Sequence, residues 1–413
     1  MDARAFEPDG GRATRGGPLV EELRQESLRL GFSRLGIAPA GPPRRQDLFH
    51  HWLDQGFAGV MRGWFERQQS LRADPATLLA GVRSVIMLAT DHATTVPSSG
   101  RPETEAAPIM GCVAGQGRGR VARYAWGDDY HDVLRSRVNG LGAWLEARMP
   151  GCRTRGVVDS APLAEREFAW LAGLGWFGKN TMLIDTGAGS FFFLTALLTD
   201  LDLPADAAME VDHCGTCTAC LDACPTQAFV APRVLDASRC ISALSIEDHG
   251  PIDVDLRPGM QDWVFGCDIC QEVCPWNRHA PGSTVPAFQP RGDVSGGLPS
   301  DGATLSLAEL LRLDESGFRA RFKGSPLRRA KRRGLLRSAA IALGNRPDAA
   351  SFASLANALD DMEPVVRGAA AWALGRWCQA EAALADPARA ALRARLEIET
   401  DADVRAEIEP ALS

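Results

Sequence analysis

The sequence predicts a mixed α/β protein in three parts: an α/β layer domain, a short segment organised by cysteines, and a C-terminal domain of α-helical repeats. Three observations lead to this fold class. Buried-strand patterns alternate with helical patterns in the first half of the chain, eight cysteines gather between residues 214 and 274, and a six-residue motif recurs near the C-terminus. Alternating strands and helices are typical of α/β layers, and a recurring motif is typical of stacked helix pairs.

Length and composition set the outer bounds. A chain of 413 residues is long enough for several domains, about two to four. The apolar content of 45% and the charged content of 23% are ordinary for a soluble globular protein. The formal net charge of −7 gives no general attraction to nucleic acid, so a nucleic-acid site would need a local basic patch.

No segment has the composition of a signal peptide or a membrane span. Residues 1–17 carry arginines among glycines and acids without an apolar core, and we expect a disordered tail there. The most apolar run, Phe191 to Leu198, has eight residues, whereas a bilayer needs roughly 20. We therefore expect a cytoplasmic protein without a membrane partner.

Residues 18–205 are predicted to form the α/β domain. Leu19 to Leu30 repeats apolar residues at helical spacing, and a second helical pattern runs from His131 to about Met149. Val82 to Ala89 and Ser190 to Leu198 are continuous apolar runs that suit buried strands. Strands and helices thus alternate along this part of the chain, which favours the α/β class.

Asp159 is a candidate catalytic residue by its position. A predicted strand ends at Val158, and Ser160 can cap a helix that runs to Leu174. The carboxyl end of a strand is where α/β folds keep ligands and catalytic groups. The alternative is that Asp159 merely shares the helix cap with Ser160.

Two further motifs have open roles. The stretch from Arg123 to His131 gathers polar and aromatic side chains, including both tyrosines of the chain; packing and loop anchoring are the alternative. Gly173 to Asn180 is nearly a P-loop, but Asn180 replaces the hydroxyl that would hold magnesium, and a helix precedes the motif where a strand is required. Nucleotide hydrolysis is therefore not expected, although such a glycine-rich turn can approach a ligand closely.

The cysteines carry the most specific pattern. Their first run has the spacing of bacterial two-cluster ferredoxins, in which three thiolates hold one cluster and the cysteine before proline reaches the other. We expect two 4Fe-4S clusters, one on Cys214, Cys217, Cys220 and Cys274 and the other on Cys224, Cys240, Cys267 and Cys270. A pair of zinc sites is the alternative. The ferredoxin-like two-cluster domain is predicted over residues 206–285.

The C-terminal part is predicted to be a HEAT-like repeat domain over residues 327–413, after a linker over residues 286–326 rich in Pro, Gly and Ser at its start. Ala339 to Gly344 recurs, with one change of side-chain type, as Ala370 to Gly375. Stacked helix pairs of this kind leave a curved surface for a partner.

A basic block stands at the entrance to these repeats. It consists of Arg328, Arg329, Lys331, Arg332 and Arg333. The block concentrates positive potential where phosphates could bind, and a solvated helix face is the alternative.

Together these motifs resemble the epoxyqueuosine reductase family, cobalamin-dependent iron–sulfur oxidoreductases that make the last step of queuosine in tRNA. The resemblance extends from about residue 18 to residue 413. The motifs that carry it are Val157–Pro162, Gly173–Asn180, Gly189–Leu194, the first cysteine run, Arg239–Ser242 and Gly266–Asn277.

The resemblance implies a base-off cobalamin between the α/β domain and the clusters, reduced to the cob(I) state. Its cobalt would attack the epoxide, Asp159 would protonate the opening oxygen, and loss of water would follow. Ser242 lies closest to Cys267 and Cys270, so their cluster would deliver the electrons. By motif match, the cobalamin contacts are Arg72, Ala122, Asp159, Asn180, Leu183 and Ser242.

The resemblance also implies partners. The basic block would grip the anticodon stem of a tRNA that carries epoxyqueuosine at the wobble position. An external low-potential donor such as flavodoxin or ferredoxin would supply electrons to a monomeric enzyme. The loop from His92 to Gly119 is longer than the family pattern, and the N-terminal tail is extra.

Two other functions fit part of the sequence. A reductive dehalogenase would share cobalamin and two clusters, but such enzymes usually carry an export signal. A ferredoxin-type electron carrier would share the clusters, but it would not need the α/β domain.

Overall fold

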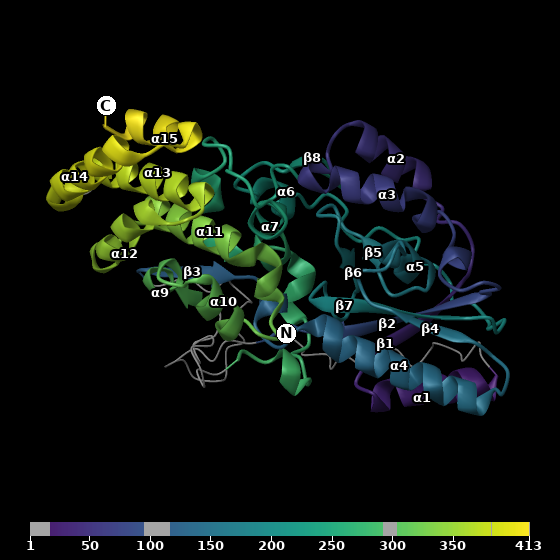
Figure 1. Ribbon diagram of the computed structural model, residues 1–413. Coiled ribbons are helices and arrows are strands. Elements are labelled where there is room, and N and C mark those ends of the chain that lie inside the picture. The colour runs from purple at the N-terminus through teal and green to yellow at the C-terminus, as the bar shows by residue number, and fades with distance from the viewer. Residues whose placement is uncertain (1–16, 95–115, 292–303, 381, 413) are drawn as a thin grey trace, which may run out of the picture.

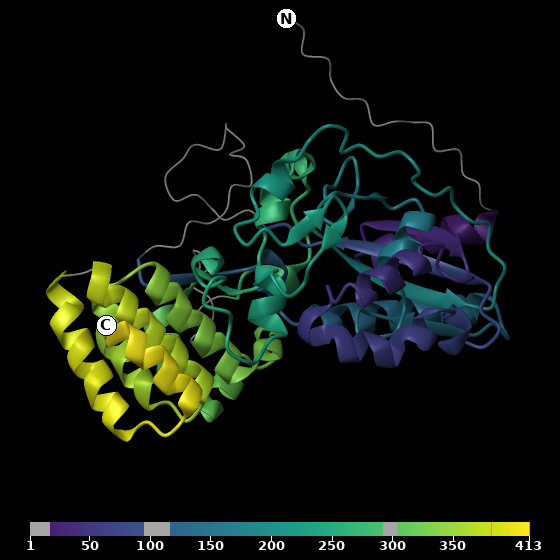
Figure 2. The same ribbon diagram turned by 90° about the horizontal axis from the view of Figure 1, so that it is seen from above.

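The computed structural model describes residues 17–94, 116–291, 304–380 and 382–412. Three regions follow one another across the molecule: α/β layers, a cysteine-containing segment in the middle, and helices at the C-terminal end (Figure 1). The view from above shows the same order (Figure 2). No helix among the described residues is long and apolar enough to cross a membrane.

A four-stranded sheet is the centre of the α/β layers, and every neighbouring pair in it is antiparallel. In spatial order the strands are β1 (Arg34–Pro39), β2 (Ser84–Asp91), β7 (Phe192–Thr199) and β4 (Thr154–Val157). Residues Val85 to Ala89 of β2 are fully buried, which requires that both faces of the sheet be covered.

Helices cover both faces of this sheet. On one face, α1 (Pro18–Arg29) and α4 (Tyr130–Arg148) pack Leu23 and Leu134 against Ile86. On the other face, α5 (Glu165–Leu171) packs Phe168 against the strands. The sheet therefore lies between two helical layers.

The predicted α1, β2, β7 and α4 are confirmed within a few residues. The prediction that a helix starts at Ser160 is wrong, because α5 begins at Glu165. The Ser160 hydroxyl instead donates a hydrogen bond to the Val158 carbonyl at 3.3 Å. Asp159 has a φ of 49°, so the chain makes a tight turn there where a helix start was expected. The sheet is antiparallel, so the position of Asp159 does not follow from the rule for parallel strands.

A helical layer outside the sheet forms the roof of the cavity described below. It consists of α2 (Gln46–Asp54), η1 (Gly59–Met61), α3 (Arg62–Arg72) and η2 (Pro75–Thr77). Opposite it lies the hairpin of β5 (Trp176–Phe177) and β6 (Leu183–Ile184).

The cysteine segment has little regular structure, as is usual where metal–ligand bonds organise the chain. Its elements are α6 (Ala219–Asp222), β8 (Phe229–Ala231), β9 (Val234–Leu235), α7 (Ile241–Ile246), η4 (Pro258–Met260), α8 (Ile269–Glu272) and η5 (Pro275–His279). The α6 and α8 helices, one from each cysteine run, contact each other.

A small sheet joins the three regions. Its central strand β3 (Arg118–Val121) is parallel to β10 (Trp263–Phe265) and antiparallel to β11 (Thr304–Ser306). A short helix, η3 (Arg123–Ala125), follows β3. One strand from each region thus contributes to a shared core with the C-terminal helices.

The C-terminal helices stack in the order that the repeated motif suggests. Gly344 of α11 lies against Trp372 of α13, and the equivalent Gly375 of α13 lies against Ala411 of α15. A Cβ atom on either glycine would come within 2.5 Å of the next helix, so both positions require glycine. The helices are α11 (Lys331–Asn345), η8 (Ala349–Ser351), α12 (Phe352–Asn357), η9 (Ala358–Asp360), α13 (Pro364–Ala380), α14 (Ala382–Ile398) and α15 (Ala402–Leu412).

The predicted linker over residues 286–326 contains regular structure. Its elements are η6 (Pro286–Phe288), β11, α9 (Leu307–Leu311) and α10 (Glu315–Arg321), and η7 (Pro326–Ala330) begins at its end. Leu307, Leu310 and Phe318 are buried in the core of the C-terminal helices, so this stretch belongs to that domain. The predicted tail up to residue 16 and residues 95–115 of the long loop lie outside the described residues.

Candidate active site and cysteine-containing segment

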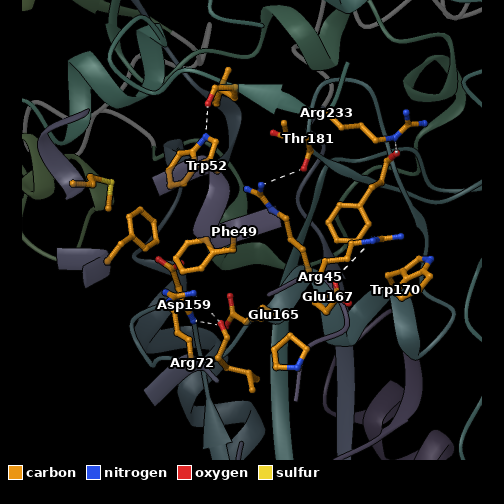
Figure 3. A pocket seen from close by; sticks show the side chains of 18 of the residues that line it. Arg45, Phe49, Trp52, Arg72, Asp159, Glu165, Glu167, Trp170, Thr181 and Arg233 are labelled. Atoms are coloured by element: carbon orange, nitrogen blue, oxygen red, sulfur yellow. Dashed lines mark hydrogen bonds and ion pairs between the residues drawn. The ribbon is translucent and has the colours of Figure 1, made fainter. Parts of the chain in front are cut away.

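A cavity of about 1520 Å³ opens between the α/β layers, the cysteine segment and the start of the C-terminal helices. Typical small-molecule pockets have volumes of about 300–1,000 Å³, so this cavity can hold a large ligand. In Figure 3 Asp159, Glu165 and Arg72 lie together at one end, and Arg45, Glu167 and Trp170 lie at another.

Asp159 presents its carboxylate to this cavity with 57% of the side chain exposed. The Tyr130 hydroxyl donates to Asp159 Oδ2 at 2.8 Å, and His131 Nε2 lies 3.1 Å from the same oxygen. Both partners come from the first turn of α4, where Asp129 caps the helix by accepting from the His131 N–H. Two elements that are distant in sequence therefore meet at one carboxylate oxygen.

The ionisation of this group favours a proton on the histidine. Partial burial works against a charge on His131, but hydrogen bonds from the imidazole to Asp129 and Asp159 raise its pKa to about 9. Desolvation acts to raise the pKa of Asp159, and the hydrogen bonds from His131 and Tyr130 outweigh it, so the pKa lies below its usual range. At neutral pH the site therefore holds an imidazolium beside a carboxylate.

The Glu165 side chain stabilises the turn at Asp159. The Asp159 backbone N–H donates to Glu165 Oε1 at 2.7 Å. Burial, followed by the Asp159 charge, raises the pKa of Glu165 to about 8. Arg72 donates to the Leu163 carbonyl at 3.3 Å and also lines the cavity. The left-handed backbone at Asp159 is thus fixed by contacts on its own loop.

Aromatic side chains form the wall that the sequence did not predict. Phe49 and Trp52 of α2 each lie 5.6 Å from the Phe65 ring of α3, in edge-to-face contacts. All three line the cavity. The helical spacing of Phe49 and Trp52 was a usable signal, but it does not show which side of the helix faces a ligand.

The residues matched to the cobalamin contacts separate into two groups. Arg72 and Asp159 line the cavity. Ala122, Asn180, Leu183 and Ser242 are absent from its described wall, and the first three are buried in protein contacts. The Asn180 amide donates to the Cys270 carbonyl at 3.1 Å, so this side chain already has a hydrogen-bond partner within the protein.

Thiols within each predicted set lie near enough to influence one another's pKa. Burial, and then the Cys274, Cys214 and Cys217 thiols, raise the pKa of Cys220 to about 11. Burial also raises the pKa of Cys270, with contributions from Cys240, Cys220 and Cys224 among its neighbours. Among the described residues no group of three or more His, Cys, Asp or Glu could hold a single metal ion.

Some cations of the basic block already pair with acids inside the protein, which its composition does not show. Arg332 is 8% exposed, pairs with Asp361 and donates to the Leu313 carbonyl at 2.6 Å, so its charge is largely neutralised within the protein. Arg329 pairs with Glu247 at 2.8 Å. Acids from other elements thus neutralise part of the block, which a linear sequence cannot show. Arg328 and Lys331 are exposed.

Comparison with known proteins identifies relatives along most of the chain. Residues 213–277 match the family described as "4Fe-4S double cluster binding domain", and residues 72–160 match "Epoxyqueuosine reductase QueG, DUF1730". The epoxyqueuosine reductase of Pseudomonas aeruginosa is 41% identical, over 80% of this chain and 86% of the relative. That of Escherichia coli is 37% identical, over 87% and 89%.

Solved structures give the same result. A crystal structure of epoxyqueuosine reductase with a tRNA-Tyr epoxyqueuosine-modified tRNA stem loop has a TM-score of 0.82 at 30% identity, covering 95% of this chain and 98% of that one. The epoxyqueuosine reductase of Streptococcus thermophilus has a TM-score of 0.79 at 26% identity, with 96% and 98% covered.

Proposed function

The chain belongs to the epoxyqueuosine reductase family, and we propose that its large cavity binds cobalamin together with the epoxyqueuosine base of a tRNA. It is an oxidoreductase that reduces epoxyqueuosine to queuosine, the last step of queuosine biosynthesis. The observation that carries the proposal is the position of Asp159, with Tyr130 and His131, on the wall of a cavity that also reaches the cysteine segment.

The cavity fits a corrinoid in size and in lining. Its volume exceeds that of ordinary pockets, and the aromatic wall of α2 and α3 offers flat apolar surfaces to a macrocycle. Bound cobalamin, in its reduced state, would supply the nucleophile that opens the epoxide, with electrons from two 4Fe-4S clusters. Arg72 and Asp159 are the matched residues that remain in this proposal as cofactor or substrate contacts.

The protein's own side chains contribute a proton to the reaction and position it at the reacting oxygen. Reduction of the epoxide to an alkene and water consumes two electrons and two protons. Asp159 is a carboxylate while water reaches it, but cofactor and substrate would cover its exposed face and remove that water. Loss of water raises the pKa of a carboxyl group, so the filled site allows Asp159 to receive a proton from His131 and deliver it to the opening oxygen.

The two cysteine sets would hold one cluster each, as the sequence predicts. The set containing Cys267 and Cys270 also includes Cys240, the N-cap of α7, and Ile246 at the end of that helix lines the cavity, so we assign electron delivery into the cavity to that cluster. A flavodoxin or ferredoxin is the proposed external donor. We also propose that the protein acts as a monomer in the cytoplasm.

The C-terminal helices would serve as HEAT-like repeats that hold the tRNA. A second cavity of about 490 Å³ is lined by five cationic side chains and two acids. Arg328 lines both cavities and Lys331 lines the second. This surface can therefore bind backbone phosphates while a splayed loop base enters the first cavity.

Cobalamin binding tests the proposal directly. The full-length, cluster-loaded protein is titrated anaerobically with cobalamin, and bound cofactor is followed by its visible absorption. Ala164→Trp places a large ring in the cavity lining and should abolish binding, whereas Ala76→Trp, at an exposed position outside the lining, should bind normally. Equal binding by both variants would place the cofactor elsewhere, and no binding by the unmodified protein would contradict the proposed cofactor.

A further inference from the structure

The near-P-loop motif, Gly173 to Asn180, has a position that its sequence did not reveal. It forms the β5 strand and the turn that leads into β6, and it lies against the cysteine segment. Three of its side chains donate hydrogen bonds to that segment: Trp176, Lys179 and Asn180. We call these three residues the hairpin clamp.

Trp176 contacts a ligand sulfur. Its indole Nε1–H donates to Cys214 Sγ at 3.5 Å. The ring is 2% exposed, and it packs in one apolar cluster with Cys214, Cys274 and Trp276. Two of the four thiols assigned to the first cluster, those of Cys214 and Cys274, therefore pack in the same cluster as this side chain.

Lys179 brings a positive charge to the same cysteine run. Its ammonium donates to the Gly215 carbonyl at 2.7 Å and to the Cys217 carbonyl at 2.9 Å. Within the described ranges these carbonyls are its hydrogen-bond partners, and no carboxylate lies within ion-pair distance of it. The charge is thus fixed beside the cluster loop without a neighbouring acid.

Asn180 extends the clamp to the other cysteine run. Its amide donates to the Cys270 carbonyl at 3.1 Å, and its Oδ1 accepts from the Met182 N–H at 3.2 Å. The side chain is 1% exposed. One hairpin of the α/β region therefore holds both cysteine runs.

We propose that Trp176 and Lys179 of the hairpin clamp form part of the outer shell of the cluster on Cys214, Cys217, Cys220 and Cys274 and stabilise its reduced form. This inference rests on the cluster assignment in the proposed function. A 4Fe-4S cluster gains one negative charge when it accepts one electron from the external donor. A hydrogen bond to sulfur and a nearby cation both favour the more negative state.

The second cluster provides an internal control. In the described residues its Cys224 sulfur accepts from the Ala228 N–H at 3.3 Å, and Asn180 reaches only a backbone carbonyl of its set. Trp176 and Lys179 make no hydrogen bond to that set. Changes at these two residues should therefore shift the potential of the first cluster clearly more than that of the second.

The test is an anaerobic redox titration of the full-length protein with both clusters, followed by electron paramagnetic resonance. Iron and sulfide are measured on each sample. Lys179→Met removes the charge, Lys179→Arg keeps it as the matched control, and Trp176→Phe removes the N–H while keeping an aromatic ring.

At a fixed ambient potential, Lys179→Met should lower the ratio of reduced to oxidised first cluster about tenfold, as expected for one partly exposed charge about 6 Å away at an effective dielectric constant of about 40. For a one-electron couple this is about 59 mV. Trp176→Phe should lower the same ratio about threefold, and Lys179→Arg should match the unmodified protein.

Unchanged potentials in Lys179→Met and Trp176→Phe, with full iron content, would overturn the inference. So would equal shifts of both clusters. If Lys179→Met loses iron, Trp176→Phe alone decides the matter by the same criterion. An unmodified protein that holds fewer than two clusters would instead contradict the cluster assignment, which this test detects before any variant is compared.

Discussion

The cysteine segment and the Asp159 site differ in how they are built. Most of the cysteines assigned as cluster ligands lie in two short runs, so their spacing along the chain already indicates the kind of site they form. The Asp159 site combines a turn after β4 with the first turn of α4, and the contacts join residues 28 and 29 positions apart. Local spacing can therefore identify the first site, whereas the second exists only after folding.

The largest effect is expected from breaking the cysteine segment. Cys270→Ser should remove one cluster, reduce bound iron by about half, and abolish turnover, because the electron path into the cavity is lost. Iron analysis and the conversion assay measure both effects. Cys152→Ser, outside the ligand sets and partly exposed, is the control and should keep both iron and turnover. Full activity in Cys270→Ser would remove that residue from the ligand set.

The Asp159 site should give the next largest effect. Asp159→Asn keeps the size of the side chain but cannot deliver a proton, so turnover should fall by about 10²- to 10⁴-fold. Bound iron and cobalamin should stay unchanged, which separates proton delivery from assembly. Asp132→Asn, at an exposed position in the first turn of α4 beside His131, should retain activity. A fully active Asp159→Asn would exclude this carboxylate as the acid.

The basic block allows a smaller but sharper test. Replacing the exposed Arg328 and Lys331 together by alanine should weaken tRNA binding about tenfold and reduce its dependence on salt. Arg332→Ala should instead lower stability by about 3–5 kcal/mol, because it leaves Asp361 buried without its partner. Filter binding at several salt concentrations and denaturant unfolding measure the two effects. The reverse pattern would restore Arg332 as a tRNA contact.

The histidine should produce a modest dependence of stability on pH. His131 has a folded pKa of about 9, against about 6.5 in an unfolded chain. Between these values the folded state binds more protons, so the stabilisation is complete below pH about 6.5 and is lost as pH rises through about 9, by at most about 1.4 kcal/mol per pH unit. Unfolding at several pH values should show this decline, and His131→Gln should flatten it. His279→Gln, at an exposed position, should leave it intact.

Much of the architecture could be predicted from the chain. The helix α1, the buried strands β2 and β7 and the helix α4 follow from periodicity and unbroken apolar runs. The repeated motif located α11 and α13. The antiparallel order of the main sheet could not be predicted, because buried strands have the same composition in either direction. The small sheet of β3, β10 and β11 was also missed, because its strands are three or four residues long and come from distant segments.

The parts of the site differ in how much of them the sequence predicts. The cysteines follow from spacing alone. Asp159 was named for a position in a parallel sheet that does not exist, and the resemblance to the family supplied the stronger reason. Glu165 and the aromatic wall were missed because burial and the direction of a helix face depend on packing. The ion pair of Arg332 could not be predicted because its partner, Asp361, lies 29 residues away.

Anaerobic conversion of the substrate tests the central claim most directly. The cluster-loaded protein is incubated with cobalamin, a strong reductant and tRNA carrying epoxyqueuosine, and the digested nucleosides are analysed by mass spectrometry. The account predicts a nucleoside lighter by one oxygen atom, formed only when cobalamin is present and not formed at a comparable rate by Asp159→Asn. Conversion without cobalamin, or no conversion by protein that holds both clusters and the cofactor, would contradict it.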